Sequence, residues 1–251
     1  YSVPLAEQAL FLRVKGLVSW ELGRPDEGAH HLEEAVRLFS EARAVEEEGA
    51  TLTLLGLLYA EEGEASPCLG ALLAGLSLLA GAQRPWLAAR GCFTLAGNLA
   101  DSGCREEAWG ALRRGLEHAG AVEDPAEAAF LRWLEGTALG SVGEAAQARE
   151  LLRQAQARYL GEGRLAEAAL ASLDLALVLA EAGTTLEIGR LAEELEERFP
   201  GAREAGEAAT ALRRTRWSDP NGLRRSVDTV TSPLRRLFRM GRHRPRPIPF
   251  V

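Results

Sequence analysis

Glycine recurs at a spacing of forty residues along most of this chain. Each member of the series lies between two helix-like segments rich in apolar residues, and the members are Gly23, Gly63, Gly103, Gly143 and Gly183. A fixed period of this size is typical of a solenoid, in which short supersecondary units stack in a row. Although 251 residues could hold two domains, the unbroken period predicts one continuous array.

A second series of very small residues lies seven positions before these glycines. It comprises Gly16, Gly56, Ala96, Gly136 and Ala176. In the second unit, Gly56 lies within an apolar face, where glycine costs a helix about 1 kcal/mol relative to alanine. That cost is tolerable where another helix must come close. We therefore expect close helix–helix contacts at this series.

Turn and capping residues divide each period into two helices. In the second unit, Gly63 is expected to end a helix in the left-handed conformation. Ser66 and Pro67 then predict a new helix, with Ser66 as the N-cap and Pro67 at the first position. In the fourth unit, Asp124 before Pro125 predicts another N-cap. Each unit is therefore predicted to be a helix hairpin.

A family resemblance lies in the residues around these turns. Leu55-Gly56-x-x-Tyr59, followed by Gly63 and a small residue five positions later, resembles the tetratricopeptide repeat (TPR). The pattern recurs as Leu95-Ala96-x-x-Leu99 with Gly103 and as Leu175-Ala176-x-x-Leu179 with Gly183. The usual TPR unit has about 34 residues, so armadillo or HEAT units, which are longer, are the structural alternative. The resemblance covers roughly residues 5–200 and implies an all-α, right-handed α-solenoid of stacked antiparallel hairpins.

The period predicts three segments. Residues 1–200 hold five TPR-like units of 40 residues. Residues 201–240 are predicted to form a degenerate, Arg-rich sixth hairpin or cap, because terminal repeats of solenoids are atypical. Residues 241–251 are predicted to be an extended Pro/Arg-rich tail. Since the chain begins at Tyr1 and its one methionine is Met240, we expect it to be a fragment or a processed product.

In the TPR family the first helices of successive units line a concave groove. Counted from the glycines, the resemblance implies a partner-binding groove formed by Arg13, Leu17, Trp20, Thr53, Leu57, Arg90, Phe93, Phe130, Trp133, Leu173 and Leu177, with Glu61, Gly97 and Thr137 beside them. This mostly apolar or small lining suits an amphipathic helix or an extended apolar peptide. The alternative for any one of these residues is burial inside the array. The Lys and Asn residues with which some TPR domains clamp a terminal carboxylate are missing, so that activity is not expected.

Charge is divided along the chain. Residues 1–200 carry a net charge of −15 and residues 201–251 a net charge of +8. The second part holds a candidate patch for an anionic partner, either nucleic acid or an acidic protein surface. We favour the alternative that these arginines pair with the acidic units. The patch comprises Arg213, Arg214, Arg216, Arg224, Arg225, Arg235, Arg236 and Arg239.

Residues typical of catalysis are few. The chain has no Gly-rich phosphate loop, no H-E-x-x-H and no nucleophile elbow. Asp174, in an apolar run, is interpreted either as a buried acid paired with an arginine or as a groove residue. The cysteines Cys68, Cys92 and Cys104 are interpreted as small buried thiols, and the adjacent pair His30-His31 suits a solvated face. We therefore expect no enzymatic activity, no cofactor and no metal.

These features predict a non-catalytic protein-interaction scaffold or adaptor. No apolar segment is long enough to suggest a membrane span, so we expect a cytoplasmic protein. Twenty-eight arginines against one lysine suggest a GC-rich bacterial genome, and hence a subunit of a bacterial regulatory, signalling or defence assembly. The alternative is a nucleic-acid-associated subunit that docks through its Arg-rich C-terminus.

Overall fold

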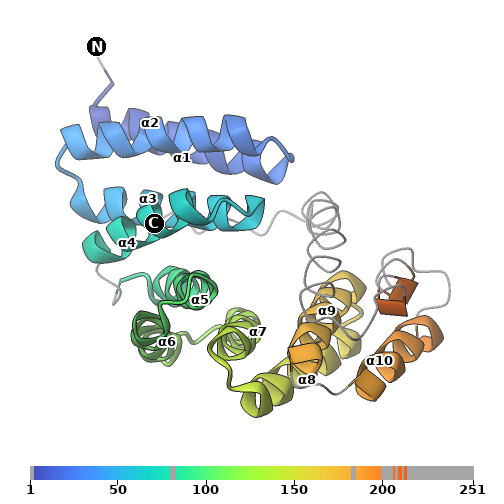
Figure 1. Cartoon of the computed structure of the whole chain (residues 1–251). Helices are drawn as coiled ribbons and strands as arrows, with labels where there is room; N and C mark the ends of the chain where they lie inside the picture. The colour runs from blue at the N-terminus through green and yellow to red at the C-terminus, as the bar shows by residue number, and fades with distance from the viewer. Residues whose placement is uncertain are drawn as a thin grey trace.

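The computed structural model describes residues 3–79, 83–181 and 185–198, together with residues 206, 209, 210, 212 and 213. The described chain holds ten α-helices and no strand. Consecutive helices pair into five hairpins that stack in chain order (Figure 1). The helices are α1 (Leu5–Glu21), α2 (Pro25–Glu41), α3 (Val45–Glu62), α4 (Ala65–Leu78), α5 (Pro85–Asp101), α6 (Arg105–Ala119), α7 (Pro125–Val142), α8 (Ala145–Gly161), α9 (Leu165–Glu181) and α10 (Thr185–Arg198). The predicted all-α array of hairpins is confirmed.

The hairpins turn relative to one another along the array. Figure 1 shows α1 to α4 lying across the view, whereas α5 to α8 are seen more nearly end-on. Each helix packs on its partner within the hairpin, and every hairpin packs on the next through at least one of its helices. Stacking with a rotation between hairpins is how a solenoid makes a curved surface from a repeated unit.

The glycines of the forty-residue series make the turns inside the hairpins. Gly23, Gly63, Gly103 and Gly143 have φ values of +74°, +79°, +82° and +95°. This left-handed conformation strains residues that carry a Cβ, so glycine is the residue that ends the first helix within so short a turn. The fifth member, Gly183, lies outside the described residues.

The second series of small residues lets the two helices of a hairpin touch. A Cβ added to Gly56 would lie 2.7 Å from Leu72 Cγ and 3.0 Å from the Leu72 backbone nitrogen. A Cβ added to Gly16 would lie 2.9 Å from the Gly28 carbonyl oxygen. The equivalent positions are also buried within their hairpins, and they hold Ala96, Gly136 and Ala176. The predicted close approach is confirmed.

The start of α4 differs from the prediction, and the start of α7 agrees with it. α4 begins at Ala65, directly after the Gly63 turn, so Ser66 and Pro67 lie inside its first turn. The turn fixes this start, and a proline is accommodated there because the first N–H groups of a helix have no intrahelical partner. At α7 the prediction is confirmed, since the Asp124 carboxylate accepts hydrogen bonds of 2.8 Å from the backbone N–H groups of Ala126 and Glu127.

Hydrophobic packing runs through all five hairpins. One continuous cluster of buried side chains extends from Trp20 in α1 to Leu212, and a small second cluster surrounds Phe39 in the first hairpin. Within residues 201–240, Ala209 and Leu212 are helical and fully buried. The remainder of that segment and the tail 241–251 lie outside the described residues, so the three predicted segments stay a prediction.

Candidate functional site

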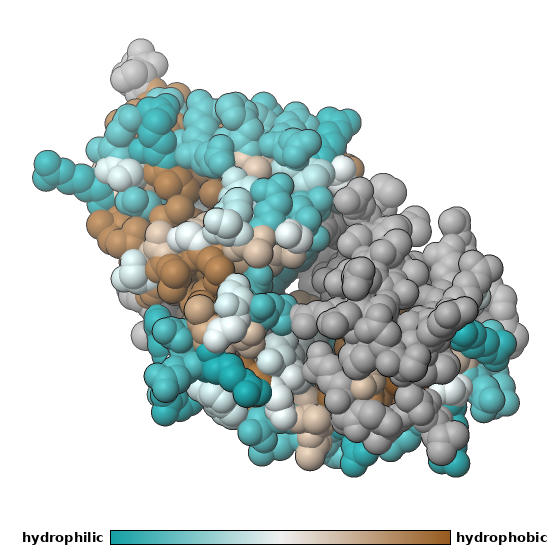
Figure 2. Space-filling view, in the orientation of Figure 1, coloured by the Kyte–Doolittle hydropathy of each residue, from teal (hydrophilic) through white to brown (hydrophobic). Residues whose placement is uncertain are grey.

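A groove of about 470 Å³ runs along one side of the array. All the described residues that line it come from the first helices of the hairpins, α1, α3, α5, α7 and α9. On the face seen in Figure 2, the surface is hydrophilic over α1 and α2, and hydrophobic residues gather over α3 and α4. Five consecutive units therefore contribute to a single concave site.

The lining residues of each first helix lie on one helical face. In α5 they include Arg90, Thr94, Gly97 and Asp101, which are spaced by four, three and four residues. This spacing keeps side chains on the same side of a helix. The same positions line the groove from α7 as Phe130, Leu134, Thr137 and Ser141.

Most of the residues predicted for the groove lie at its wall. They are Leu17, Trp20, Leu57, Arg90, Phe93, Phe130, Trp133 and Leu177, and Glu61, Gly97 and Thr137 join them. Trp20, Leu57, Phe93 and Trp133 are also buried, as the alternative predicted. Their role in binding a partner stays a prediction.

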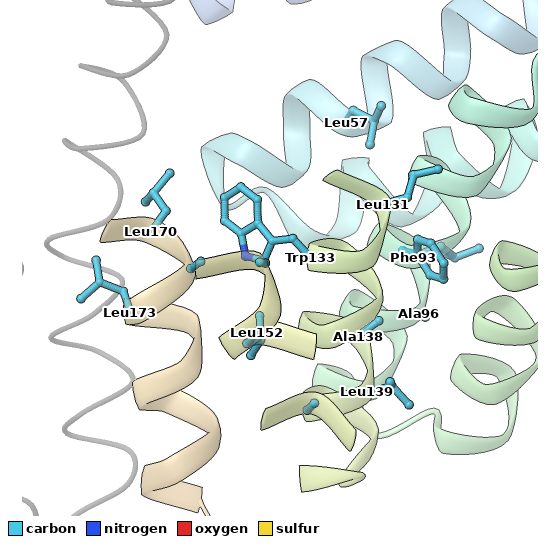
Figure 3. Close-up of a cluster of buried hydrophobic side chains, with 14 of the residues drawn as sticks. Leu57, Phe93, Ala96, Leu131, Trp133, Ala138, Leu139, Leu152, Leu170 and Leu173 are labelled. Carbon is cyan, nitrogen blue, oxygen red and sulfur yellow. The ribbon is translucent and has the colours of Figure 1, made fainter. Parts of the chain in front are cut away.

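Three predicted residues lie elsewhere. Thr53 is fully buried, and its hydroxyl donates a 2.9 Å hydrogen bond to the Gly49 carbonyl. Leu173 is fully buried in the core (Figure 3). Arg13 lies over the Phe39 ring, 5.4 Å from its centroid. All three occupy one repeat position, which in these units faces a neighbouring helix instead of the groove.

Glu47 joins three successive hairpins by charge. Its carboxylate accepts hydrogen bonds from Arg13 of α1 and from Arg84, which directly precedes α5. Burial acts to raise the pKa of Glu47, but the hydrogen bonds and positive charges of Arg13 and Arg84 outweigh it, so the pKa is lowered. Arg13 therefore helps to hold the stack together.

Aromatic rings form a connected row along the groove. The rings of Trp86 and Phe130 stack with centroids 6.4 Å apart, and Phe130 meets Trp133 edge-on at 5.7 Å. The Arg90 guanidinium lies over Trp86 and Phe130, 5.4 and 5.5 Å from their centroids, and pairs with Glu61 at 3.1 Å. These contacts hold Arg90 and the rings in place before any ligand binds.

Asp174 belongs to the groove and has an aromatic partner. Trp133 Nε1 of α7 donates a 2.8 Å hydrogen bond to Asp174 Oδ2 of α9. Asp174 is only 7% exposed and lines the groove. Figure 3 shows Trp133 on the side of α7 that faces Leu170 of α9. The structure thus places this acid in the groove wall and also buries it.

The groove is acidic. Among the lining residues that the structure describes, Glu21, Glu61, Asp101 and Asp174 are acids, and Arg90 is the one base. With ionised carboxylates the lining carries a net charge of −3. A concave, partly apolar site with charges of one sign raises the local concentration of oppositely charged groups.

Several lining residues were not identified in the sequence, among them Trp86, Glu21 and Asp101. Trp86 stands one helical turn before Arg90, so extending the predicted stripe by one turn would have found it. Leu54, Thr94 and Leu134 share a repeat position with Asp174, but their mixed chemistry gave no common pattern.

Of the Arg-rich patch, the structure describes only Arg213. Arg213 pairs with Glu196 of α10 at 2.5 Å, as the favoured pairing with the acidic units predicts. The patch residues Arg214, Arg216, Arg224, Arg225, Arg235, Arg236 and Arg239 lie outside the described residues.

The cysteines and histidines are placed partly as expected. Cys68 and Cys92 are buried and free, and burial raises the pKa of each thiol to about 11. Cys104 is exposed, contrary to the expectation, because it follows the Gly103 turn directly. His31 is buried as well, so the adjacent pair with His30 does not form a solvated face.

Comparisons with known proteins identify the fold. No family model and no curated protein matches the sequence. A Rap protein solved in complex with Competence and Sporulation Factor matches with a TM-score of 0.65 and 18% identity over 90% of this chain. The TPR-like repeats of a Podosopora anserina kinesin light chain, in a single-substitution variant, match with a TM-score of 0.57 and 18% identity, covering 79% of this chain and 97% of theirs.

The present chain spans 65% of the length of the Rap protein chain. Within the described ranges, no helix combines the length and hydropathy needed to cross a membrane.

Proposed function

We propose that this chain, a TPR-like repeat protein by fold, is a non-catalytic scaffold that holds a peptide segment of a protein partner in the groove of its first helices. The observation that carries the proposal is one concave site lined from five consecutive first helices. Its volume and its mixture of aromatic, aliphatic and few charged side chains suit ligand recognition. The Rap protein, solved in complex with a factor, supports ligand binding by this fold.

The charges of the groove define the chemistry of the peptide. Arg90 is already engaged by Glu61 and two aromatic rings, so it offers little to an incoming carboxylate. Acids outnumber bases by four to one among the lining residues that the structure describes. The peptide therefore combines apolar side chains, which cover the aromatic row, with at least one Lys or Arg.

The groove is suited to binding and not to bond making. No histidine, lysine or cysteine stands among the residues that line it within the described chain. The Trp133–Asp174 pair orients an acid but supplies no nucleophile or second catalytic acid. We place the scaffold in the cytoplasm, as part of a bacterial regulatory, signalling or defence assembly. The arginine-rich composition and the buried free thiols Cys68 and Cys92 support that setting.

Matched peptides test the proposal. Peptides selected from a random library on the full chain would each be compared with a version in which Lys and Arg are replaced by Glu, and binding would be followed through tryptophan fluorescence. We expect the replacement to weaken binding by at least about 10-fold, which is about 1.4 kcal/mol, and added salt to weaken binding of the parent peptide. Equal binding of both versions would contradict an acidic recognition site.

A further inference from the structure

A cluster of metal-ligating side chains lies on α2, apart from the groove lining. We propose that His30, His31 and Glu34 form a binding site for a divalent transition metal, with Zn²⁺ as the best match. One potential ligand atom from each residue lies within 4.8 Å of the other two. None of the three residues lines the groove, so this inference does not rest on the proposed function.

The helix itself brings the three side chains together. Glu34 stands four residues after His30 and three after His31, and both spacings make neighbours on a helix surface. The two imidazole rings are tilted by 48° with centroids 5.6 Å apart. The carboxylate is therefore next to both rings, and a single turn of α2 presents all three ligands.

His31 provides the independent observation. Its side chain is buried, with 8% of the residue exposed. Neither Nδ1 nor Nε2 has a hydrogen-bond partner among the described residues, and both nitrogens are out of contact with solvent. A buried polar group without a partner is costly. Coordination of a metal by one of these nitrogens gives it a partner.

The donor set fits zinc. Imidazole nitrogen and carboxylate oxygen bind Zn²⁺ at about 2.0–2.2 Å, which places tetrahedral ligand atoms about 3.4 Å apart. His30 is exposed and Glu34 is half-buried, so these two side chains can rotate inward while burial keeps His31 fixed. Three protein ligands leave a fourth position for water or for a group from a partner. Binding would fasten one turn of α2 within the first hairpin.

Titration of the full chain with Zn²⁺, and separately with Co²⁺, tests the site. Calorimetry is expected to give one saturable Zn²⁺ site per chain, and Co²⁺ is expected to give the visible absorption of a low-symmetry complex. His30→Ala and Glu34→Gln should each weaken Zn²⁺ binding by at least about 10-fold, since even loss of an outer-shell partner costs that much. Both changes are at accessible positions, and circular dichroism would verify that the helices persist.

A control variant at another histidine distinguishes Zn²⁺ binding at this site from nonspecific Zn²⁺ binding. His118 is a partly exposed histidine on α6, and His118→Ala should leave the Zn²⁺ affinity unchanged within about 2-fold. Zn²⁺ should also raise the thermal unfolding midpoint of the parent chain but not of His30→Ala, because a ligand stabilises the state that binds it. Absence of saturable Zn²⁺ binding, or equal affinity in the parent and His30→Ala, would overturn the proposal.

Discussion

The indole N–H of Trp133 donates a 2.8 Å hydrogen bond to the carboxylate of Asp174, which joins α7 to α9 at the wall of the groove. Trp133 is 6% exposed and Asp174 is 7% exposed. A carboxylate this deeply buried is costly unless hydrogen bonds stabilise it. The same hydrogen bond thus stabilises the buried carboxylate in the groove wall and fixes the position of the hairpin of α7 relative to that of α9.

Removal of the indole donor should destabilise the array. In Trp133→Phe the Asp174 carboxylate loses a hydrogen bond in a buried position, so we expect a loss of about 1–3 kcal/mol in the free energy of unfolding. Urea denaturation measures it. Trp86→Phe is the matched control, because the Trp86 indole N–H has no hydrogen-bond partner among the described residues. Equal losses in the two variants would show that the hydrogen bond contributes nothing beyond packing.

Enlargement of Gly56 should separate the helices of the second hairpin. Gly56→Leu introduces a side chain where a Cβ alone would meet Leu72 at 2.7 Å, and overpacking costs about 1–3 kcal/mol. Gly70→Leu in α4 is the control, since a Cβ there would meet no atom within 4 Å. The denaturation midpoint should be lower than that of the parent for Gly56→Leu and unchanged for Gly70→Leu. An unchanged midpoint for Gly56→Leu would refute the role of close approach.

The three thiols should differ in reactivity. Cys68 and Cys92 are buried, and burial raises the pKa of each to about 11, so little reactive thiolate forms near neutral pH. Cys104 is exposed. A chromogenic disulfide reagent should therefore label one thiol rapidly in the folded chain and all three in denaturant. Cys104→Ser should remove the rapid phase, and a second rapid thiol would contradict the burial of the other two.

Acid should weaken the link between the first three hairpins. The pKa of Glu47 is lowered from its ordinary value of 4.5 because Arg13 and Arg84 outweigh the effect of burial. A lowered pKa in the folded state stabilises the fold above 4.5 and loses that effect as the pH falls through the folded-state value. Glu47→Gln should therefore unfold more easily than the parent at neutral pH, and the difference should shrink in acid.

A neighbouring acid provides the control for that pH series. Glu48 is in the first turn of α3 like Glu47 but makes no ion pair within the described residues, so Glu48→Gln controls for loss of a carboxylate at this helix end. If the Glu47→Gln difference is as large below pH 4.5 as above it, the ionised pair is not the cause. Urea midpoints measured across the series decide between these outcomes.

The hairpins were predictable because short turns and close helix contacts accept few residue types. Gly63 supplies a positive φ, and Gly56 supplies room for Leu72. Small residues therefore recur at both positions in each unit of the sequence. Cys68, five residues after Gly63, is fully buried at the position where the pattern requires a small side chain. Such local constraints are visible without knowledge of the neighbouring hairpins.

The groove was less predictable because one residue step turns a side chain by about 100° around a helix. Thr53 and Leu173 share a repeat position with Phe93 and Trp133, yet only the two aromatic residues reach the groove. The burial of His31 likewise depends on packing between helices, which the spacing within α2 does not reveal.

Peptide binding after obstruction of the groove tests the central claim most directly. Gly97 lines the groove, and a Cβ added there would meet only Ser141 Oγ, at 3.8 Å, so Gly97→Phe fills the site without disturbing the fold. Gly110→Phe on α6 is the control, because a Cβ there would meet no atom within 4 Å. For a library-selected basic and apolar peptide, we expect Gly97→Phe to weaken affinity by at least about 10-fold and Gly110→Phe to leave it unchanged. Undiminished affinity in a folded Gly97→Phe chain would contradict binding in the groove.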